Sequence, residues 1–225
     1  MNMNSINRIR KQVVFVAFVG LLLVVIWIIL TIFTIPSGTV QDQIVRLKNN
    51  LPLYKWSFFN ASLISIPMSV LIISLAFSGN SFKERMLLNI LSVFWLVPYV
   101  MLVSIAYVSQ YTLFPRLLNS NSDVHLIEML YFYNRDSFVY FFDLLGYVFL
   151  SLSAFFVGLK LILSRNKFRR GVGVLFWLMA FSALIGFTGY IMDNTVIEQG
   201  VMISGIFSII LLFLISVSGK KLFSQ

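Results

Sequence analysis

The chain of 225 residues has no cysteine, one histidine and few charges, since 11% of its residues are Asp, Glu, Lys or Arg. Without cysteine it can form no disulfide, thiolate metal site or iron–sulfur cluster, and it has no cysteine nucleophile. His125 is its one histidine, so a single chain cannot supply two histidine ligands to a haem or build a histidine-rich metal centre. We therefore expect no cofactor.

Familiar catalytic motifs are also missing. No HExxH, glycine-rich phosphate loop or GxSxG sequence occurs, and no lysine lies in the middle of an apolar run. The stretch "DVHLIEML" places Asp123, His125 and Glu128 within six residues, and a catalytic zinc ion needs three protein ligands. His125 and Glu128 would share a helix face, but Asp123 has a poorer offset, which favours a surface loop without metal. The sequence thus favours a protein that is not an enzyme.

Apolar residues dominate what is present, because 59% of the chain is hydrophobic. The charges fall in clusters, and the stretches between them reach the ~20 residues that a helix needs to cross ~30 Å of hydrocarbon. Backbone groups in lipid must bond within their own segment, so these stretches are expected to be helices, whereas a β-barrel would show short alternating segments. The predicted fold is all-α, a polytopic membrane protein forming one bundle over residues 1–225. Its six spans are expected near residues 13–34, 57–77, 86–108, 138–162, 171–192 and 199–218.

The distribution of Lys and Arg predicts an orientation. If the N-terminus is cytoplasmic, twelve of the 17 basic residues lie on inner segments and five on outer ones. The outer five are Arg46, Lys48, Lys55, Arg116 and Arg135. The positive-inside rule therefore favours two cytoplasmic termini in a multi-pass protein of the cell (cytoplasmic) membrane. The same rule explains the net charge of +9 without a nucleic-acid partner.

Two larger outer segments, 35–56 and 109–137, separate these spans. In "VHLIEMLYFYNRDSF" the apolar residues have helical spacing, which predicts an amphipathic helix on the outer membrane surface. Its aromatic residues suit the depth of the lipid headgroups, where Tyr and Trp are enriched. These residues are Tyr131, Phe132, Tyr133, Phe138 and Tyr140.

Small residues at four-residue spacing indicate which helices pack closely, because they let two backbones approach. Three predicted spans carry such ridges: Ser57, Ala61, Ser65 and Ser69 in the second, Ser182, Gly186 and Gly189 in the fifth, and Gly200, Ser204 and Ser208 in the sixth. The first span offers only Ala17 and Gly20. We expect spans two, five and six to be interior and span one peripheral. The serine ridge could instead form a polar pathway.

Pro67 and Pro98 interrupt the second and third spans. Each removes a backbone donor and frees a carbonyl one turn earlier, near Leu63 and Phe94. Such positions are simple kinks in many helices, and in transporters broken helices line substrate sites. Two neighbouring kinks would widen one end of the bundle and suit a cavity.

Asp143 is the carboxylate of the predicted fourth span, and two interpretations of it stay open. From Asp143 to Lys160 is about 25 Å along a helix, which is ~5 Å short of the hydrocarbon core. Lys160 could extend to the inner surface while Asp143 stays at the outer edge. Alternatively, Asp143 lies inside the bundle, where an ionisable group acquires a partner and marks a site. Arg135, Arg116 and Asn89 would then be polar partners.

The inner loop "RNKFRRGVG" carries Arg165, Lys167, Arg169 and Arg170 in a short stretch. This basic cluster could bind anionic lipid or a cytoplasmic protein partner. The positive-inside rule explains it as well.

The stretch "FFDLLGYVFLSLSAFFVG" resembles uncharacterised bacterial six-helix membrane proteins in which Asp-x-x-Gly-aromatic, here Asp143, Gly146 and Tyr147, opens a span. That resemblance implies no activity. Size, six spans and cytoplasmic ends also look like the substrate-binding components of energy-coupling vitamin importers. Those components carry an Ala-x-x-x-Ala seam in their first helix, and here Ala17 is followed by Leu21.

The function expected from the sequence is non-enzymatic binding or transport of a small ligand through an outward-facing cavity between spans two, three and four. The candidate ligand-binding residues are Asp143, Arg135, Tyr147, Pro98 and Pro67. An alternative is an interaction or regulatory protein that contacts its partner through the basic inner loop, and a third is a lipid-modifying enzyme. The partners expected are the lipid bilayer, a small molecule, and an anionic lipid or protein at that loop.

Overall fold

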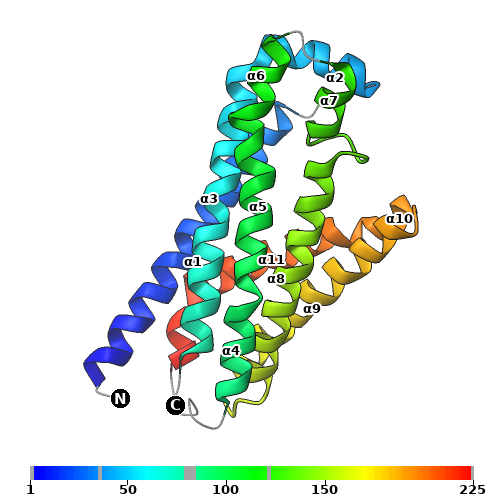
Figure 1. Cartoon of the computed structure of the whole chain (residues 1–225). Helices are drawn as coiled ribbons and strands as arrows, with labels where there is room; N and C mark the ends of the chain where they lie inside the picture. Colours follow the sequence, from blue (N-terminus) through cyan, green and yellow to red (C-terminus); the bar gives the residue numbers. More distant parts are fainter. Residues whose placement is uncertain (1–2, 35–36, 79–84, 121–122, 224–225) are drawn as a thin grey trace. The chain divides into compact units, whose positions relative to one another are not determined.

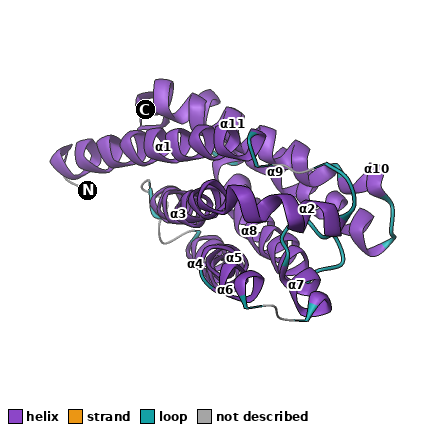
Figure 2. Cartoon of the chain, turned by 90° about the horizontal axis from the view of Figure 1, so that it is seen from above, coloured by secondary structure: helices purple, strands orange, loops and turns teal. Residues whose placement is uncertain are grey.

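The computed structural model describes residues 3–34, 37–78, 85–120 and 123–223. Within these ranges every element of regular secondary structure is a helix (Figures 1 and 2). The elements are α1 (Met3–Ile32), α2 (Val40–Leu47), η1 (Lys48–Asn50), α3 (Leu51–Ala76), α4 (Met86–Phe94), α5 (Leu96–Tyr111), α6 (Leu113–Asn119), α7 (Val124–Leu130), α8 (Phe138–Ile162), α9 (Lys167–Ile191), α10 (Thr195–Glu198), α11 (Gly200–Ser218) and η2 (Gly219–Phe223).

In the described part of the chain, six helical segments are long and apolar enough to cross a membrane. They are Ile9–Ile32, Val40–Ala76, Met86–Asn119, Phe138–Ile162, Lys167–Ile191 and Thr195–Phe223. This confirms the all-helical class and the number of candidate spans, and it fits a multi-pass membrane protein. The second and third segments are longer than expected, because helix continues from the apolar runs into stretches that were expected to be outer loops.

The chain divides into two compact units, and four helices contribute to both. Unit 1 comprises residues 1–21, 66–99 and 147–225, and unit 2 comprises residues 22–65 and 100–146. The divided helices are α1, α3, α5 and α8. The single bundle expected from the sequence stays a prediction, and each unit is described below by itself.

Pro98 breaks the third candidate span, whereas Pro67 does not break the second. Helix α4 ends at Phe94, whose carbonyl Pro98 cannot reach with a hydrogen bond, and α5 begins at Leu96. Pro67 lies inside α3, which runs without interruption from Leu51 to Ala76. The expected break near Phe94 is therefore confirmed, and near Leu63 the helix is continuous.

Glycines form close backbone contacts in unit 1, between α9 and the segment from α10 to the start of α11. A Cβ atom at Gly186 would lie 2.4 Å from the backbone nitrogen of Val201, and one at Gly200 would lie 2.5 Å from the carbonyl oxygen of Ser182. A Cβ at Gly189 would lie 2.3 Å from the nitrogen of Glu198. These backbones touch because hydrogen stands where a side chain would be, as the small-residue spacing predicts.

Burial confirms the position of the first span but corrects that of the sixth. In its most apolar 18-residue window, 17% of the first span is buried, the lowest share of the six. The second and fourth spans reach 50%, the fifth 39% and the sixth only 28%. Helix α11 buries the face that carries Gly200 and Ser204, whereas Met202 and Val217 remain 68% and 67% exposed. The small residues of α11 therefore mark one packed face, and the prediction that the sixth span is an interior helix was wrong.

Candidate functional site

Unit 2 contains a cluster of stacked and tilted aromatic rings. We define the aromatic cluster as Tyr54, Phe58, Tyr107, Phe114, Tyr131, Phe132 and Tyr133. Neighbouring ring centroids in it lie between 4.6 and 6.5 Å apart, the range in which such pairs attract beyond their area. Burial raises the pKa of Tyr131 and of Tyr133, so these phenols remain neutral hydrogen-bonding groups.

Gln110 of α5 is the polar centre of this cluster and is fully buried. Its Oε1 accepts hydrogen bonds from the Tyr54 hydroxyl at 2.5 Å and from the backbone N–H of Phe132 at 3.2 Å. Its Nε2 donates to the carbonyl of Leu130 at 2.9 Å and to Ser109 Oγ at 3.0 Å. One amide side chain thus joins three segments of unit 2: α3, α5 and the end of α7.

This arrangement corrects the long amphipathic helix expected after Asp123. Helix α7 covers only Val124–Leu130, and Tyr131 has an extended backbone with ψ of 121°. The Gln110 amide bonds the carbonyl of Leu130 and the N–H of Phe132, which replaces the helical partners of these groups. Tyr131 and Phe132 are 0% and 9% exposed, so these two rings face other side chains of the protein and not lipid. Their rings belong to the core of unit 2.

Asp143 lies five residues after the start of α8, and its side chain is 6% exposed. Tyr107 of α5 is its hydrogen-bond partner, whereas its Oδ1 accepts no hydrogen bond from any residue that the structure describes. Close packing of α5 and α8 surrounds it, since a Cβ at Gly146 would lie 2.7 Å from Val103 Cγ2. The Asp143 carboxylate thus faces the interior of unit 2 and is not a solvated residue at an edge.

The other residues expected beside Asp143 fall in different parts of the chain. Arg135, in the loop before α8, is half-buried and belongs to unit 2, like Asp143. Tyr147, Pro67 and Pro98 belong to unit 1. Sequence reasoning missed Tyr107, although Tyr107 and Gln110 are polar side chains three residues apart in an apolar helix, and that spacing places them on one face.

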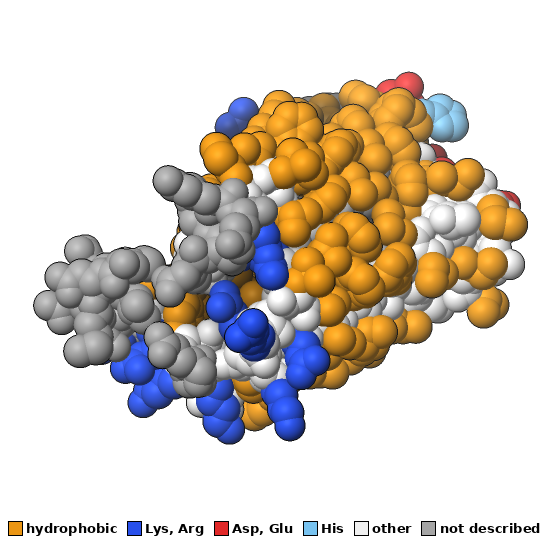
Figure 3. Space-filling model, turned by 90° about the horizontal axis from the view of Figure 1, so that it is seen from below, with side chains coloured by type: hydrophobic (Ala, Val, Ile, Leu, Met, Phe, Trp, Pro, Cys, Tyr) orange, Lys and Arg blue, Asp and Glu red, His pale blue; other side chains and the backbone are white. Residues whose placement is uncertain are grey.

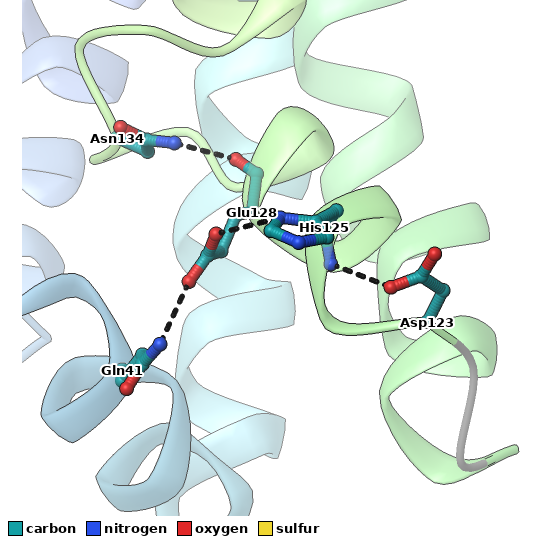
Figure 4. A network of polar contacts seen from close by, with 5 residues as sticks. All are labelled: Gln41, Asp123, His125, Glu128 and Asn134. Atoms are coloured by element: carbon teal, nitrogen blue, oxygen red, sulfur yellow. Dashed lines mark hydrogen bonds and ion pairs between the residues drawn. The ribbon is translucent and has the colours of Figure 1, made fainter.

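Asp123, His125 and Glu128 make structural contacts in unit 2 (Figure 4). The Asp123 carboxylate caps α7 by accepting the His125 N–H at 3.0 Å. Glu128 lies 3.8 Å from His125 Nδ1 and accepts a hydrogen bond from Gln41 Nε2 at 3.4 Å. Among the described residues no group of three or more His, Asp and Glu could hold a metal ion.

Lys160 has a structural role in unit 1 that differs from the expected one. It is 3% exposed, and its Nζ donates hydrogen bonds to the carbonyl oxygens of Leu75, Ala76 and Ser78, where α3 ends. A cation at this position satisfies carbonyls that have no helical partner. Its Nζ is therefore held inside unit 1, and the expectation that Lys160 extends to the inner membrane surface stays a prediction.

Two arginines add hydrogen bonds nearby, Arg85 at the end of α8 and Arg169 at the end of α3. Arg85 donates to the carbonyls of Lys160 at 2.8 Å and Leu163 at 3.1 Å, and Arg169 donates to Ser78 Oγ at 3.1 Å. Three cations therefore share one end of unit 1. The remaining candidates of the basic loop after α8, Arg165, Lys167 and Arg170, are exposed, and Lys and Arg side chains gather on the face seen in Figure 3.

Unit 1 also buries an amide that the sequence did not single out as a site. Asn89 of α4 is 0% exposed, and neither its Oδ1 nor its Nδ2 has a hydrogen-bond partner among the described residues. Ser92, one turn later, accepts a hydrogen bond at its carbonyl from Ser153 of α8. Asn89 lies in unit 1, whereas Asp143, for which it was a candidate partner, lies in unit 2.

Comparisons of the chain with models of protein families, with curated proteins and with solved structures found no match. The resemblances noted for "FFDLLGYVFLSLSAFFVG" and for the vitamin importers therefore stay hypotheses. Any function has to be argued from the residues of this chain.

Proposed function

We propose that the chain spans the cytoplasmic membrane of a cell six times, with both termini in the cytoplasm. The excess of Lys and Arg on the segments that would be inner supports this orientation. Apolar side chains on the candidate spans support insertion, because a bilayer would cover them. Phe15, Ile66 and Met202, for example, are 64%, 58% and 68% exposed.

Single cysteines test this orientation without background, because the chain has none of its own. We expect a membrane-impermeant maleimide to label Asp136→Cys on intact cells and to leave Lys167→Cys unlabelled until the membrane is opened. Both positions are exposed in the structure, so the side of the membrane on which each cysteine lies determines whether it is labelled. Labelling of Lys167→Cys on intact cells would reverse the orientation.

We propose further that the chain is not an enzyme and that it binds, or lets pass, a small ligand at the outer part of spans three and four. The observation that carries this proposal is the buried Oδ1 of Asp143, which lacks a hydrogen-bond partner among the described residues. A buried acceptor without a partner costs free energy, so the position favours a ligand that donates a hydrogen bond or carries positive charge. Small amines and monovalent cations are the chemical class that fits.

The substitution Asp143→Asn tests this site, because it removes the charge and keeps the shape. A charge-assisted hydrogen bond contributes ~1.5–3 kcal/mol, so we expect the affinity for the ligand to fall about 10- to 100-fold. The measurement is the shift in melting temperature of the purified protein with a panel of small amines and monovalent cations. Asp136→Asn, exposed and seven residues earlier, is the matched control and should keep the wild-type response.

Two results would contradict the site at Asp143. One is a panel in which no compound stabilises the wild-type protein. The other is a compound that stabilises the wild type and Asp143→Asn to the same degree, since its binding would not involve the carboxylate.

A second candidate function is contact with an anionic lipid or protein partner through Arg165, Lys167, Arg169 and Arg170. The exposure of three of these four side chains favours it. This function does not involve Asp143, so Asp143→Asn would leave it unchanged and the two candidates can be separated.

A further inference from the structure

Unit 1 has a surface hollow between α1 and the end of α11. Its volume is about 420 Å³. The lining residues are Arg10, Lys11, Val14, Phe15 and Phe18 of α1, with Ser216 of α11 and Lys220 of η2. All seven belong to unit 1. None of the candidate site residues discussed above is among them.

Two glycines bring α1 and α11 together beside this hollow. A Cβ at Gly219 would lie 2.8 Å from Val14 Cγ2, and a Cβ at Gly20 would lie 3.3 Å from Leu212 Cδ2. Since later residues of α1 meet earlier residues of α11, the two helices run antiparallel, side by side (Figure 2). The hollow therefore has one wall on each of two packed helices.

The lining separates charge from hydrocarbon along α1. Arg10 and Lys11 stand at the start of the first candidate span, and Lys220 stands beyond the end of α11. Phe15 and Phe18 follow toward the interior of the span and are 64% and 55% exposed. From Arg10 to Phe18 is about 12 Å along a helix, which is the step from a headgroup into the acyl region. Among the residues that the structure describes, no acidic side chain lines the hollow.

Arg10, Lys11 and Lys220 are the polar side chains of the hollow that a ligand would contact, because the remaining polar residue, Ser216, already has a hydrogen-bond partner. The Ser216 hydroxyl donates to the carbonyl of Leu212 at 2.6 Å, so it is already engaged within α11. Lys and Arg bind phosphate, like carboxylate, through charge-assisted hydrogen bonds, and phosphate is the anionic group of phospholipid headgroups. A soluble anion would gain nothing from Phe15 and Phe18, whereas a lipid would use both parts of the lining.

We propose that this hollow binds an anionic phospholipid, with the headgroup phosphate among Arg10, Lys11 and Lys220 and an acyl chain along Phe15 and Phe18. Basic pockets between transmembrane helices are suited to anionic headgroups. The inference rests on the proposed insertion in a membrane but not on the proposed ligand at Asp143. It assigns the positive charge at the start of α1 and the end of α11 a binding role in addition to orientation.

The test compares two double variants of equal charge in the full chain. Arg10→Gln/Lys220→Gln removes two cations of the hollow, and Lys48→Gln/Lys55→Gln removes two exposed cations that belong neither to the hollow nor to the basic loop 165–170. Native mass spectrometry and thermal melts with phosphatidylglycerol report binding, and phosphatidylcholine serves as the zwitterionic lipid. In detergent or in nanodiscs with identical leaflets, the result does not depend on the orientation of the chain.

We expect the affinity for phosphatidylglycerol to fall about 25-fold in Arg10→Gln/Lys220→Gln, since each of the two basic residues near an anionic lipid contributes about a 5-fold factor. The control variant should lose less than 3-fold. Equal losses in both variants would mean that net charge rather than the hollow attracts the lipid. Equal binding of phosphatidylcholine and phosphatidylglycerol would also overturn the proposal.

Two further measurements test whether the occupant of the hollow is a lipid. Phe15→Ala/Phe18→Ala keeps every charge and should also weaken phosphatidylglycerol binding, whereas a wild-type affinity would contradict the acyl contact. Glycerol 1-phosphate, which has the headgroup chemistry without acyl chains, should stabilise the wild type far less than the lipid. If it stabilises equally, the occupant is a soluble anion and the proposed lipid site is wrong.

Discussion

Gly186→Ala is expected to destabilise unit 1 by ~1–3 kcal/mol or more, although alanine is the better helix former. The added Cβ would lie 2.4 Å from the backbone nitrogen of Val201 and 2.9 Å from the carbonyl carbon of Gly200. Backbone atoms cannot rotate away as the end of a side chain can, so α9 and α11 would have to separate. The two helices pack against each other extensively within unit 1.

Gly205→Ala is the matched control, because nothing lies within 4 Å of a Cβ at that position of α11. It should leave the melting temperature unchanged or raise it slightly, since alanine restricts the unfolded chain more than glycine does. The measurement is the thermal or denaturant unfolding of the purified variants in detergent. A melt of Gly186→Ala that matches Gly205→Ala would show that the two backbones are not in contact there.

Gln110→Leu is expected to cost ~3 kcal/mol or more, because it leaves three buried groups of unit 2 without their partner. These are the Tyr54 hydroxyl, the carbonyl of Leu130 and the N–H of Phe132, and each unsatisfied group costs ~1–3 kcal/mol. The leucine adds apolar volume where an amide stood but can accept none of these bonds. Beyond the loss of stability, we expect residues 131–134 to become protease-sensitive, since Gln110 joins this segment to α5.

Graded variants at the same site separate the contributions. Tyr54→Phe removes one hydrogen bond and should cost a third to a half as much as Gln110→Leu. The double variant should cost less than the sum of the two single changes, because residues in one hydrogen-bond network couple. Full additivity would argue that the Tyr54 hydroxyl and Gln110 do not interact.

Hydropathy predicted the helical class and the number of candidate spans because each apolar run is a local property of the chain. The small-residue spacing likewise predicted close packing at Gly186 and at Gly200, since side-chain size at the crossing point determines how closely two helices approach. Pro98 predicted the break after Phe94, because the missing N–H acts on a carbonyl in the same helix.

The candidate site depended on contacts that no local pattern contains. The edge position of Asp143 was inferred from the distance to Lys160, and both side chains turned out to be buried. Lys160 hydrogen-bonds the end of α3, more than 80 residues earlier in the chain. The hollow of α1 and α11 joins positions near opposite ends of the sequence, and no periodicity could have shown it.

By itself, therefore, the sequence determined which segments are helical and apolar, where proline interrupts them and which faces carry small residues. Only the tertiary structure decided that α7 ends at Leu130, that Tyr107 hydrogen-bonds Asp143, and that three cations meet beside Phe15 and Phe18. The physical reason is that backbone propensity and hydrocarbon length act within one segment. A hydrogen bond between buried side chains, by contrast, is set by whichever distant segment packs against it.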